Sequence, residues 1–101
     1  MKYKQNYIYL ITDKDRFKIG FTTNPKKRNS EYKVHNLDYK FEGVFKVDDK
    51  EAEKSIHMSL LKQGFTRCLS YKEWFEGNLS LKKLEQEIKD YYSRKDYINV
   101  L

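Results

Sequence analysis

The sequence predicts an α+β domain, a small three-stranded antiparallel sheet flanked by helices, on the basis of three observations. Two short segments rich in aromatic and β-branched residues enclose a polar turn, which is typical of a β-hairpin. A further segment, 39–47, alternates apolar and polar residues as a half-buried strand does. Three other segments begin with polar capping residues, and two of them carry apolar residues at helical spacing. Such elements stack as layers of helices on a sheet around one core.

The length of 101 residues and the composition limit the classes of protein to consider. We expect one domain over residues 1–101, because a chain of this size buries one small core. Only four glycines and one proline are present, and 16% of residues are aromatic, which excludes a low-complexity chain. The longest apolar run, residues 7–11, is too short for a membrane span or a signal peptide. With Cys68 as the single cysteine, neither an internal disulfide nor a four-ligand zinc site is expected, and an intracellular, cytoplasmic location is predicted.

The first predicted element is a hairpin of residues 7–11 and 17–21 joined by a polar loop. Side chains alternate across a strand, so Tyr7 and Tyr9 share one face while Ile8 and Leu10 share the other. The hairpin therefore offers two phenols on one side of the sheet.

A helix is predicted to begin at Thr23-Asn24-Pro25 and to end near Asn36, because a polar cap precedes a proline suited to the first turn. Within it Arg28, Tyr32 and His35 fall at positions i, i+4 and i+7. These three side chains therefore line one face of the helix.

A second helix is predicted after Asp48-Asp49-Lys50-Glu51, a capping sequence, with an end at Gly64. Glu53 and His57 lie one turn apart beside its apolar stripe, so neither side chain is fully solvated or buried. Residues 65–78 show no period and are expected to be irregular. Ser80 caps a third predicted helix over about 80–93, and a less ordered tail is expected beyond Arg94.

The basic charge is concentrated in the N-terminal third of the chain. Residues 1–37 hold nine basic and three acidic side chains, whereas residues 38–101 hold twelve of each. One basic patch that faces a polyanion is the natural interpretation, and a solvated lysine-rich face is the alternative.

The motifs and their order resemble the GIY-YIG nuclease superfamily over roughly residues 6–78. The resemblance is carried by Tyr7-Ile8-Tyr9, Phe17-Lys18-Ile19-Gly20, Arg28 eight residues after the glycine, Ala52-Glu53 followed by His57, and Glu73-Trp74-Phe75. More narrowly, the chain is similar to the small branch of phages, large DNA viruses and bacteria. In that branch the second motif is KIG, and an A-E-x-x-(I/L)-H helix precedes E-W-F.

This resemblance implies an active site on one sheet face that cleaves a phosphodiester with one divalent metal ion, Mg²⁺ or Mn²⁺. Tyr9 matches the tyrosine that acts as general base or orients the attacking water. Lys18 matches the second-motif position, which is a tyrosine in other branches. Arg28 matches the arginine that grips the scissile phosphate, and Glu53 matches the carboxylate that holds the metal. His57 is a further catalytic candidate, with a purely structural role as an equal alternative.

The chain departs from the family pattern at several positions. Tyr7 replaces the glycine of the first motif and is an alternative to Tyr9 as the working phenol. Tyr32 stands where a histidine is often found, and His35 is a possible substitute. We expect Tyr32 and His35, together with Lys26 and Lys27, to bind nucleic acid. Glu73 is a weaker candidate behind the site, Trp74 is interpreted as a packing residue, and Asn78 only weakly matches the asparagine of larger members.

The chemistry of these residues supports the same roles independently. A planar guanidinium makes paired hydrogen bonds to two phosphate oxygens, which suits Arg28. Magnesium prefers oxygen ligands and commonly keeps several waters beside one or two carboxylates, so Glu53 alone is sufficient. A phenol with a pKa of about 10 needs nearby cations to act as a base at pH 7, and Lys18, Arg28 or the metal are expected to supply them for Tyr9.

The sequence thus predicts a metal-dependent endonuclease that hydrolyses DNA, as a monomer or a homodimer and without a membrane partner. Two alternatives stay open: a catalytically inactive nucleic-acid-binding module of the same fold, and a viral or phage protein that binds another protein. Each candidate also has a structural interpretation. Tyr9 suits cross-strand packing, Arg28 suits a solvated helix surface, and Glu53 with His57 suits a helix-surface pair.

Overall fold

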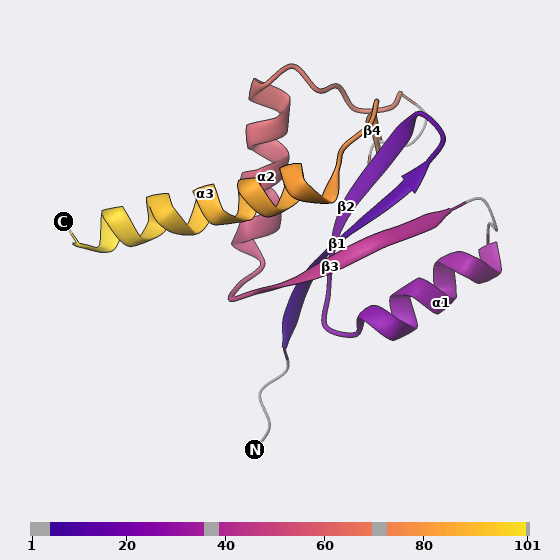
Figure 1. Ribbon diagram of the computed structural model, residues 1–101, viewed down its shortest axis with the longest axis horizontal. Coiled ribbons are helices and arrows are strands. Elements are labelled where there is room, and N and C mark those ends of the chain that lie inside the picture. Colours follow the sequence, from indigo (N-terminus) through magenta and orange to yellow (C-terminus); the bar gives the residue numbers. More distant parts are fainter. Residues whose placement is uncertain (1–4, 36–38, 70–72, 101) are drawn as a thin grey trace.

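The computed structural model describes residues 5–35, 39–69 and 73–100, with the side chains of residues 34, 35 and 95–100 left out of the description. The elements are β1 (Asn6–Asp13), β2 (Arg16–Thr22), α1 (Pro25–His35), β3 (Lys40–Val47), α2 (Glu51–Lys62), β4 (Phe75–Glu76) and α3 (Leu81–Val100) (Figure 1). The predicted α+β class is confirmed. In the parts of the chain that are described, no helix combines the length and the apolar character needed to cross a bilayer.

The sheet is antiparallel with the strand order β3-β1-β2-β4, so that β1 and β2 are the inner strands. The sequence predicts only three strands, and β4 is the addition. It pairs with the start of β2 through Arg16 opposite Glu76 and Phe17 opposite Phe75. A strand of two residues is too short to show an alternating pattern, which is why residues 65–78 were expected to be irregular.

The predicted helix caps are confirmed by their hydrogen bonds. The Asn24 side chain accepts from the Lys27 amide at 3.1 Å, Asp49 from Ala52 at 3.2 Å, and Ser80 from Lys83 at 3.1 Å. Gly64 follows α2 with a φ of +102°, a conformation that glycine adopts without strain.

The predicted end of the third helix is wrong, because α3 continues past residue 93 to Val100. The sequence after Arg94 loses its apolar stripe but contains neither glycine nor proline, so no helix breaker interrupts the backbone. Figure 1 shows this end of α3 projecting beyond the rest of the molecule.

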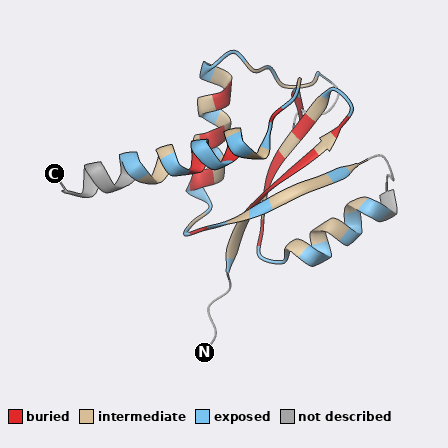
Figure 2. Cartoon of the chain, viewed as in Figure 1, coloured by how far each residue is buried: buried red, intermediate tan, exposed pale blue. Residues whose placement is uncertain are grey.

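Helices cover both faces of the sheet, and each face has its own apolar cluster (Figures 1 and 2). On one face the strand residues Ile8, Leu10 and Ile19 pack with α2 and α3. On the other face Tyr9, Ile11 and Trp74 are buried, with Tyr32 of α1 packed against them. The interpretation of Trp74 as a packing residue is confirmed, since it is 6% exposed.

A β-bulge in β3 changes which side chains face α1. The pairing shifts between Leu10 opposite Gly43 and Ile11 opposite Phe41, so that one extra residue is inserted at Glu42. Phe41 consequently stacks on Tyr9 with ring centroids 5.5 Å apart, whereas Phe45 packs into the opposite cluster. The predicted unbroken alternation of residues 39–47 is therefore wrong, because a bulge moves the following side chains to the other face.

Candidate functional site

The edge of β2 carries a cavity of about 310 Å³. β4 pairs with the first residues of β2, and within the described parts of the chain no strand pairs with the edge around Ile19 and Gly20. Tyr9, Lys18 and Gly20 line the cavity from the sheet, and side chains of α1, α2 and the segment after α2 complete it. The site is thus formed where an incomplete sheet edge meets two helices.

Tyr9 is held tightly in place, with 2% of its surface exposed. Its ring stacks on Phe41, and its hydroxyl lies 3.4 Å from the Tyr32 hydroxyl. The outer part of the ring lies directly over Gly20, where any Cβ atom would overlap the phenol. Gly20 is therefore a requirement of the site geometry, since only a residue without a side chain leaves room for Tyr9.

The environment of Tyr9 opposes ionisation. Burial raises the pKa of its phenol well above the ordinary value, and the contact with Tyr32 acts in the same direction. The positive charge of Arg28 lowers the pKa, but by less than these effects raise it. The prediction that Lys18, Arg28 or the metal favours the phenolate therefore depends on charge beyond that of Arg28, which does not overcome burial in the chain by itself.

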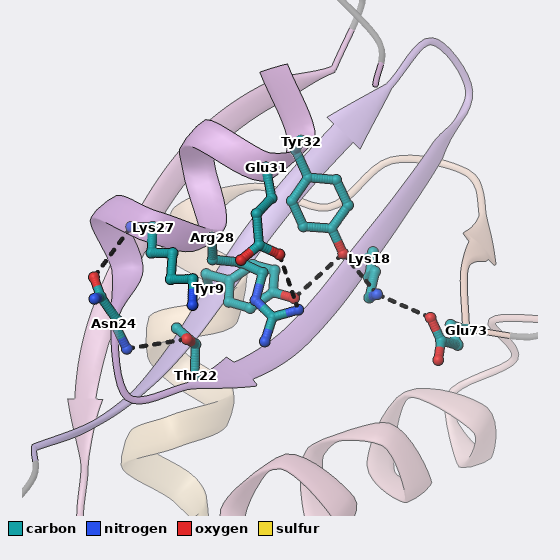
Figure 3. Close-up of polar contacts among 9 residues, drawn as sticks. All are labelled: Tyr9, Lys18, Thr22, Asn24, Lys27, Arg28, Glu31, Tyr32 and Glu73. Carbon is teal, nitrogen blue, oxygen red and sulfur yellow. Dashed lines mark hydrogen bonds and ion pairs between the residues drawn. The ribbon is translucent and has the colours of Figure 1, made fainter. Parts of the chain in front are cut away.

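Lys18 links Tyr32 to the segment before β4 (Figure 3). Its ammonium donates to the Tyr32 hydroxyl at 2.7 Å and to a carboxylate oxygen of Glu73 at 2.9 Å. Burial opposes the charge on Lys18, but these two hydrogen bonds outweigh it and raise the pKa of the ammonium. Lys18 also lowers the pKa of Glu73 through their hydrogen bond, so both groups are ionised at neutral pH. Tyr32 thus lies behind Lys18 and beside Tyr9, and does not itself line the cavity.

Arg28 enters the cavity from α1, one turn after the Asn24 cap. Its side chain is 40% exposed and lies 4.0 Å from Glu31 of the same helix. Lys26 and Lys27 are exposed on the same helix but do not line the cavity. The side chain of His35, predicted to bind nucleic acid, lies outside the described residues.

Glu53 and His57 enter the cavity from α2, whose apolar residues fix that helix on the opposite sheet face. His57 Nε2 lies 2.9 Å from the Ile19 carbonyl oxygen. Because a carbonyl only accepts, Nε2 carries the proton, and His57 satisfies the strand edge that β4 leaves open. Burial lowers the pKa of His57, which is therefore neutral at pH 7.

Five of the predicted residues, Tyr9, Lys18, Arg28, Glu53 and His57, thus surround one cavity. Tyr7 does not join them: it is half-buried and lies opposite Lys46 and Thr22, farther along β1. Tyr7 shares a strand face with Tyr9, but the cavity is lined by Gly20, the β2 partner of Tyr9, and not by Thr22, the β2 partner of Tyr7.

The sequence did not point to two further cations in the lining, Lys50 and Arg67. Lys50 was considered only as part of a helix cap. Arg67 falls in the stretch without a period, and no local pattern there distinguishes it from a solvated arginine. Both are brought to the cavity only by the packing of α2 and β4 on the sheet.

This is a small α+β domain whose sheet edge gathers phenol, ammonium, guanidinium, imidazole and carboxylate groups in one polar cavity. The family model of the T5orf172 domain matches residues 6–94, and the chain belongs to this family of nuclease-like domains. Comparison with curated proteins and with solved structures gives no match.

Proposed function

We propose that this protein is a metal-dependent endonuclease of the GIY-YIG type that hydrolyses phosphodiester bonds of DNA. The observation that carries the proposal is the shared cavity of Tyr9, Lys18, Arg28, Glu53 and His57. These residues come from four different elements, and cross-strand packing or helix-surface pairing does not require them to meet. The membership in the T5orf172 family supports a nuclease-like domain, and the motif resemblance supports the finer assignment.

The donor groups of the cavity fit a magnesium or manganese ion held by one carboxylate. Among the described residues no group of three or more histidine, cysteine, aspartate or glutamate side chains is placed to hold a metal. Of the residues that the structure describes, Glu53 and Glu73 are the two carboxylates in the lining, and Glu73 already accepts from Lys18. Glu53 therefore would hold the ion, with water and substrate oxygens as the other ligands. Such an ion supplies positive charge to the phosphate and to an attacking water.

The cations of the chain act on the substrate phosphate. Arg28 donates paired hydrogen bonds to two of its nonbridging oxygens, and Lys18 adds a point charge from the floor of the cavity. Lys18 is fixed before substrate arrives, since Tyr32 and Glu73 hold its ammonium, and Arg28 extends from α1 with 40% of its side chain exposed to a ligand. Positive groups that are already in place stabilise the charge that develops in phosphoryl transfer.

Tyr9 orients the attacking water in this proposal, and does not act as a general base in the chain by itself. The raised pKa keeps its phenol protonated in the chain by itself, so the hydroxyl orients the attacking water by a hydrogen bond. It becomes a base only when additional positive charge in the cavity lowers that pKa. His57 positions the edge of β2 through the Ile19 carbonyl.

The proposed substrate is nucleic acid inside a cell. The net charge of +6 favours a polyanion, and α1 presents Lys26 and Lys27 beside Arg28 for contacts to the backbone. Whether the active form is a monomer or a homodimer does not alter the roles of these residues.

The test is nicking of supercoiled plasmid DNA by purified protein with Mg²⁺ or Mn²⁺. We expect the wild type to nick, and Glu53→Gln, Arg28→Ala and added EDTA each to abolish nicking. Glu51→Gln is the matched control: it removes a carboxylate from the same helix, but Glu51 is exposed and does not line the cavity.

One result would contradict the enzymatic proposal. In it the wild type does not nick plasmid but binds DNA, and this binding weakens with salt and with Arg28→Ala but not with Glu53→Gln. That result identifies an inactive binding module instead. Equal nicking by Glu53→Gln and Glu51→Gln likewise overturns the metal assignment.

A further inference from the structure

We propose that Arg67 is a second phosphate-binding arginine, which holds a DNA backbone phosphate next to the scissile one. The inference rests on the proposed function and adds a binding residue to it. No motif singled out Arg67, and the evidence for it is its place in the cavity.

Arg67 is held at the cavity by an aromatic ring. Its backbone pairs with Phe75 of β4, and its guanidinium carbon lies 4.9 Å from the centre of the Phe75 ring. Phe75 is itself buried and stacks on Phe17 at 5.3 Å. Because the ring holds the planar guanidinium in place, the Arg67 side chain loses less conformational entropy when its N–H groups donate to a ligand.

Arg67 approaches the cavity from a different layer than Arg28. Arg28 lies on α1, which covers one sheet face, while Arg67 follows α2, which packs on the other. The same Phe75 ring also contacts His57 edge-on at 5.3 Å, so Arg67 lies on the α2 side of the site. A ligand in the cavity is therefore flanked by guanidinium groups from both layers.

The charge of the cavity is suited to more than one phosphate. Its lining holds the cations Lys18, Arg28, Lys50 and Arg67 against the carboxylates Glu53 and Glu73. A metal ion on Glu53 would add further positive charge. A single phosphodiester carries one negative charge, whereas a nucleic-acid strand presents a row of them. The excess of cations thus fits a backbone that passes through the cavity with neighbouring phosphates on either side of the scissile one.

The test measures binding of a fluorescently labelled DNA duplex by anisotropy at several salt concentrations, with EDTA present so that no cleavage occurs. We expect Arg67→Gln to weaken binding and to reduce the slope of log K against log salt by about one, the value for one lost phosphate contact. Arg94→Gln is the matched control, because it removes the same charge from an exposed position of α3 and should leave the slope unchanged.

Arg67→Met guards against a folding defect, because its apolar stem can still cover Phe75 while the charge is lost. It should bind as weakly as Arg67→Gln and melt like the wild type. Slopes for Arg67→Gln and Arg67→Met equal to that of the wild type overturn the inference, and the nicking assay then still decides the proposed function. A wild type that neither nicks plasmid nor binds DNA overturns both.

Discussion

Tyr9 is tightly packed in the site. The phenol is confined between Phe41 and the backbone of Gly20, with Tyr32 at its hydroxyl. Tyr9 contributes to the core through its ring and to the proposed chemistry through one oxygen atom. These two contributions can be separated by substitution.

Tyr9→Phe keeps the ring and removes the hydroxyl. We expect plasmid nicking to fall by at least about a hundredfold, the size typical of a lost proton-transferring or water-orienting group. The free energy of unfolding should change by less than about 1 kcal/mol, because the hydroxyl contact is long at 3.4 Å. Tyr7→Phe is the matched control on the same strand face and should nick like the wild type. The opposite pattern would make Tyr7 the working phenol.

Gly20→Ala tests the close approach of backbone and phenol. The added methyl group must displace the Tyr9 ring, so we expect a loss of about 1–3 kcal/mol in stability and a loss of nicking. Gly43→Ala is the control, because its Cβ would meet only the flexible Leu81 side chain at 3.0 Å. Urea denaturation of both variants checks this, and an equal, small cost at both glycines contradicts it.

At the scale of elements, α2 and α3 are joined by a buried carboxylate. Glu87 is 4% exposed and accepts from Ser59 at 2.7 Å and from Gln63 at 3.0 Å, with the Lys83 ammonium also at 3.0 Å. Burial opposes its ionisation, but these hydrogen bonds outweigh that effect and lower the pKa of Glu87. This network fixes α2, and through it Glu53 and His57, against the rest of the domain.

The lowered pKa of Glu87 predicts how stability depends on pH. Its contribution is fully present above the unfolded pKa of about 4.5 and is lost as the pH falls through the lower folded value. We expect Glu87→Gln to be less stable than the wild type by about 1–3 kcal/mol at pH 7, with a smaller difference at pH 3. Urea denaturation at both pH values measures it. Glu85→Gln, at an exposed position of α3, should have little effect, and a pH-independent cost at Glu87 argues against the linkage.

At the scale of the whole molecule, the proposed DNA-binding surface extends from the cavity over the exposed lysines at the start of α1. Lys26→Gln with Lys27→Gln should weaken binding to DNA of any sequence and reduce the salt slope by about two. The first turn of a helix gains from the loss of positive charge, so folding is not expected to suffer. Anisotropy titrations against salt measure the effect.

Lys82→Gln with Lys89→Gln provides the control for net charge. Both residues are exposed on α3, which packs on the sheet face opposite α1. Each double variant removes two lysines, so the two variants carry the same net charge. If both lower the slope equally, overall charge rather than the α1 face governs binding.

Features that depend on neighbours in the chain could be predicted from the sequence. The hairpin, the caps at Asn24, Asp49 and Ser80, and the glycine after α2 were predicted, because turns and caps are formed by residues a few positions apart. Spacing and resemblance also named five of the side chains that surround the cavity, Tyr9, Lys18, Arg28, Glu53 and His57, but not Lys50 and Arg67. Their roles in catalysis stay predictions that the nicking assay tests.

Features that depend on contacts between distant segments became visible in the folded chain. The bulge at Glu42 brings Phe41 onto Tyr9, and β4 carries Arg67 to the cavity. Burial in this packing raises the pKa of Tyr9, although the positive charge of Arg28 from α1 acts to lower it. Short pairings, bulges and desolvation leave no local pattern in a sequence, because each is set by which surfaces meet when the layers pack.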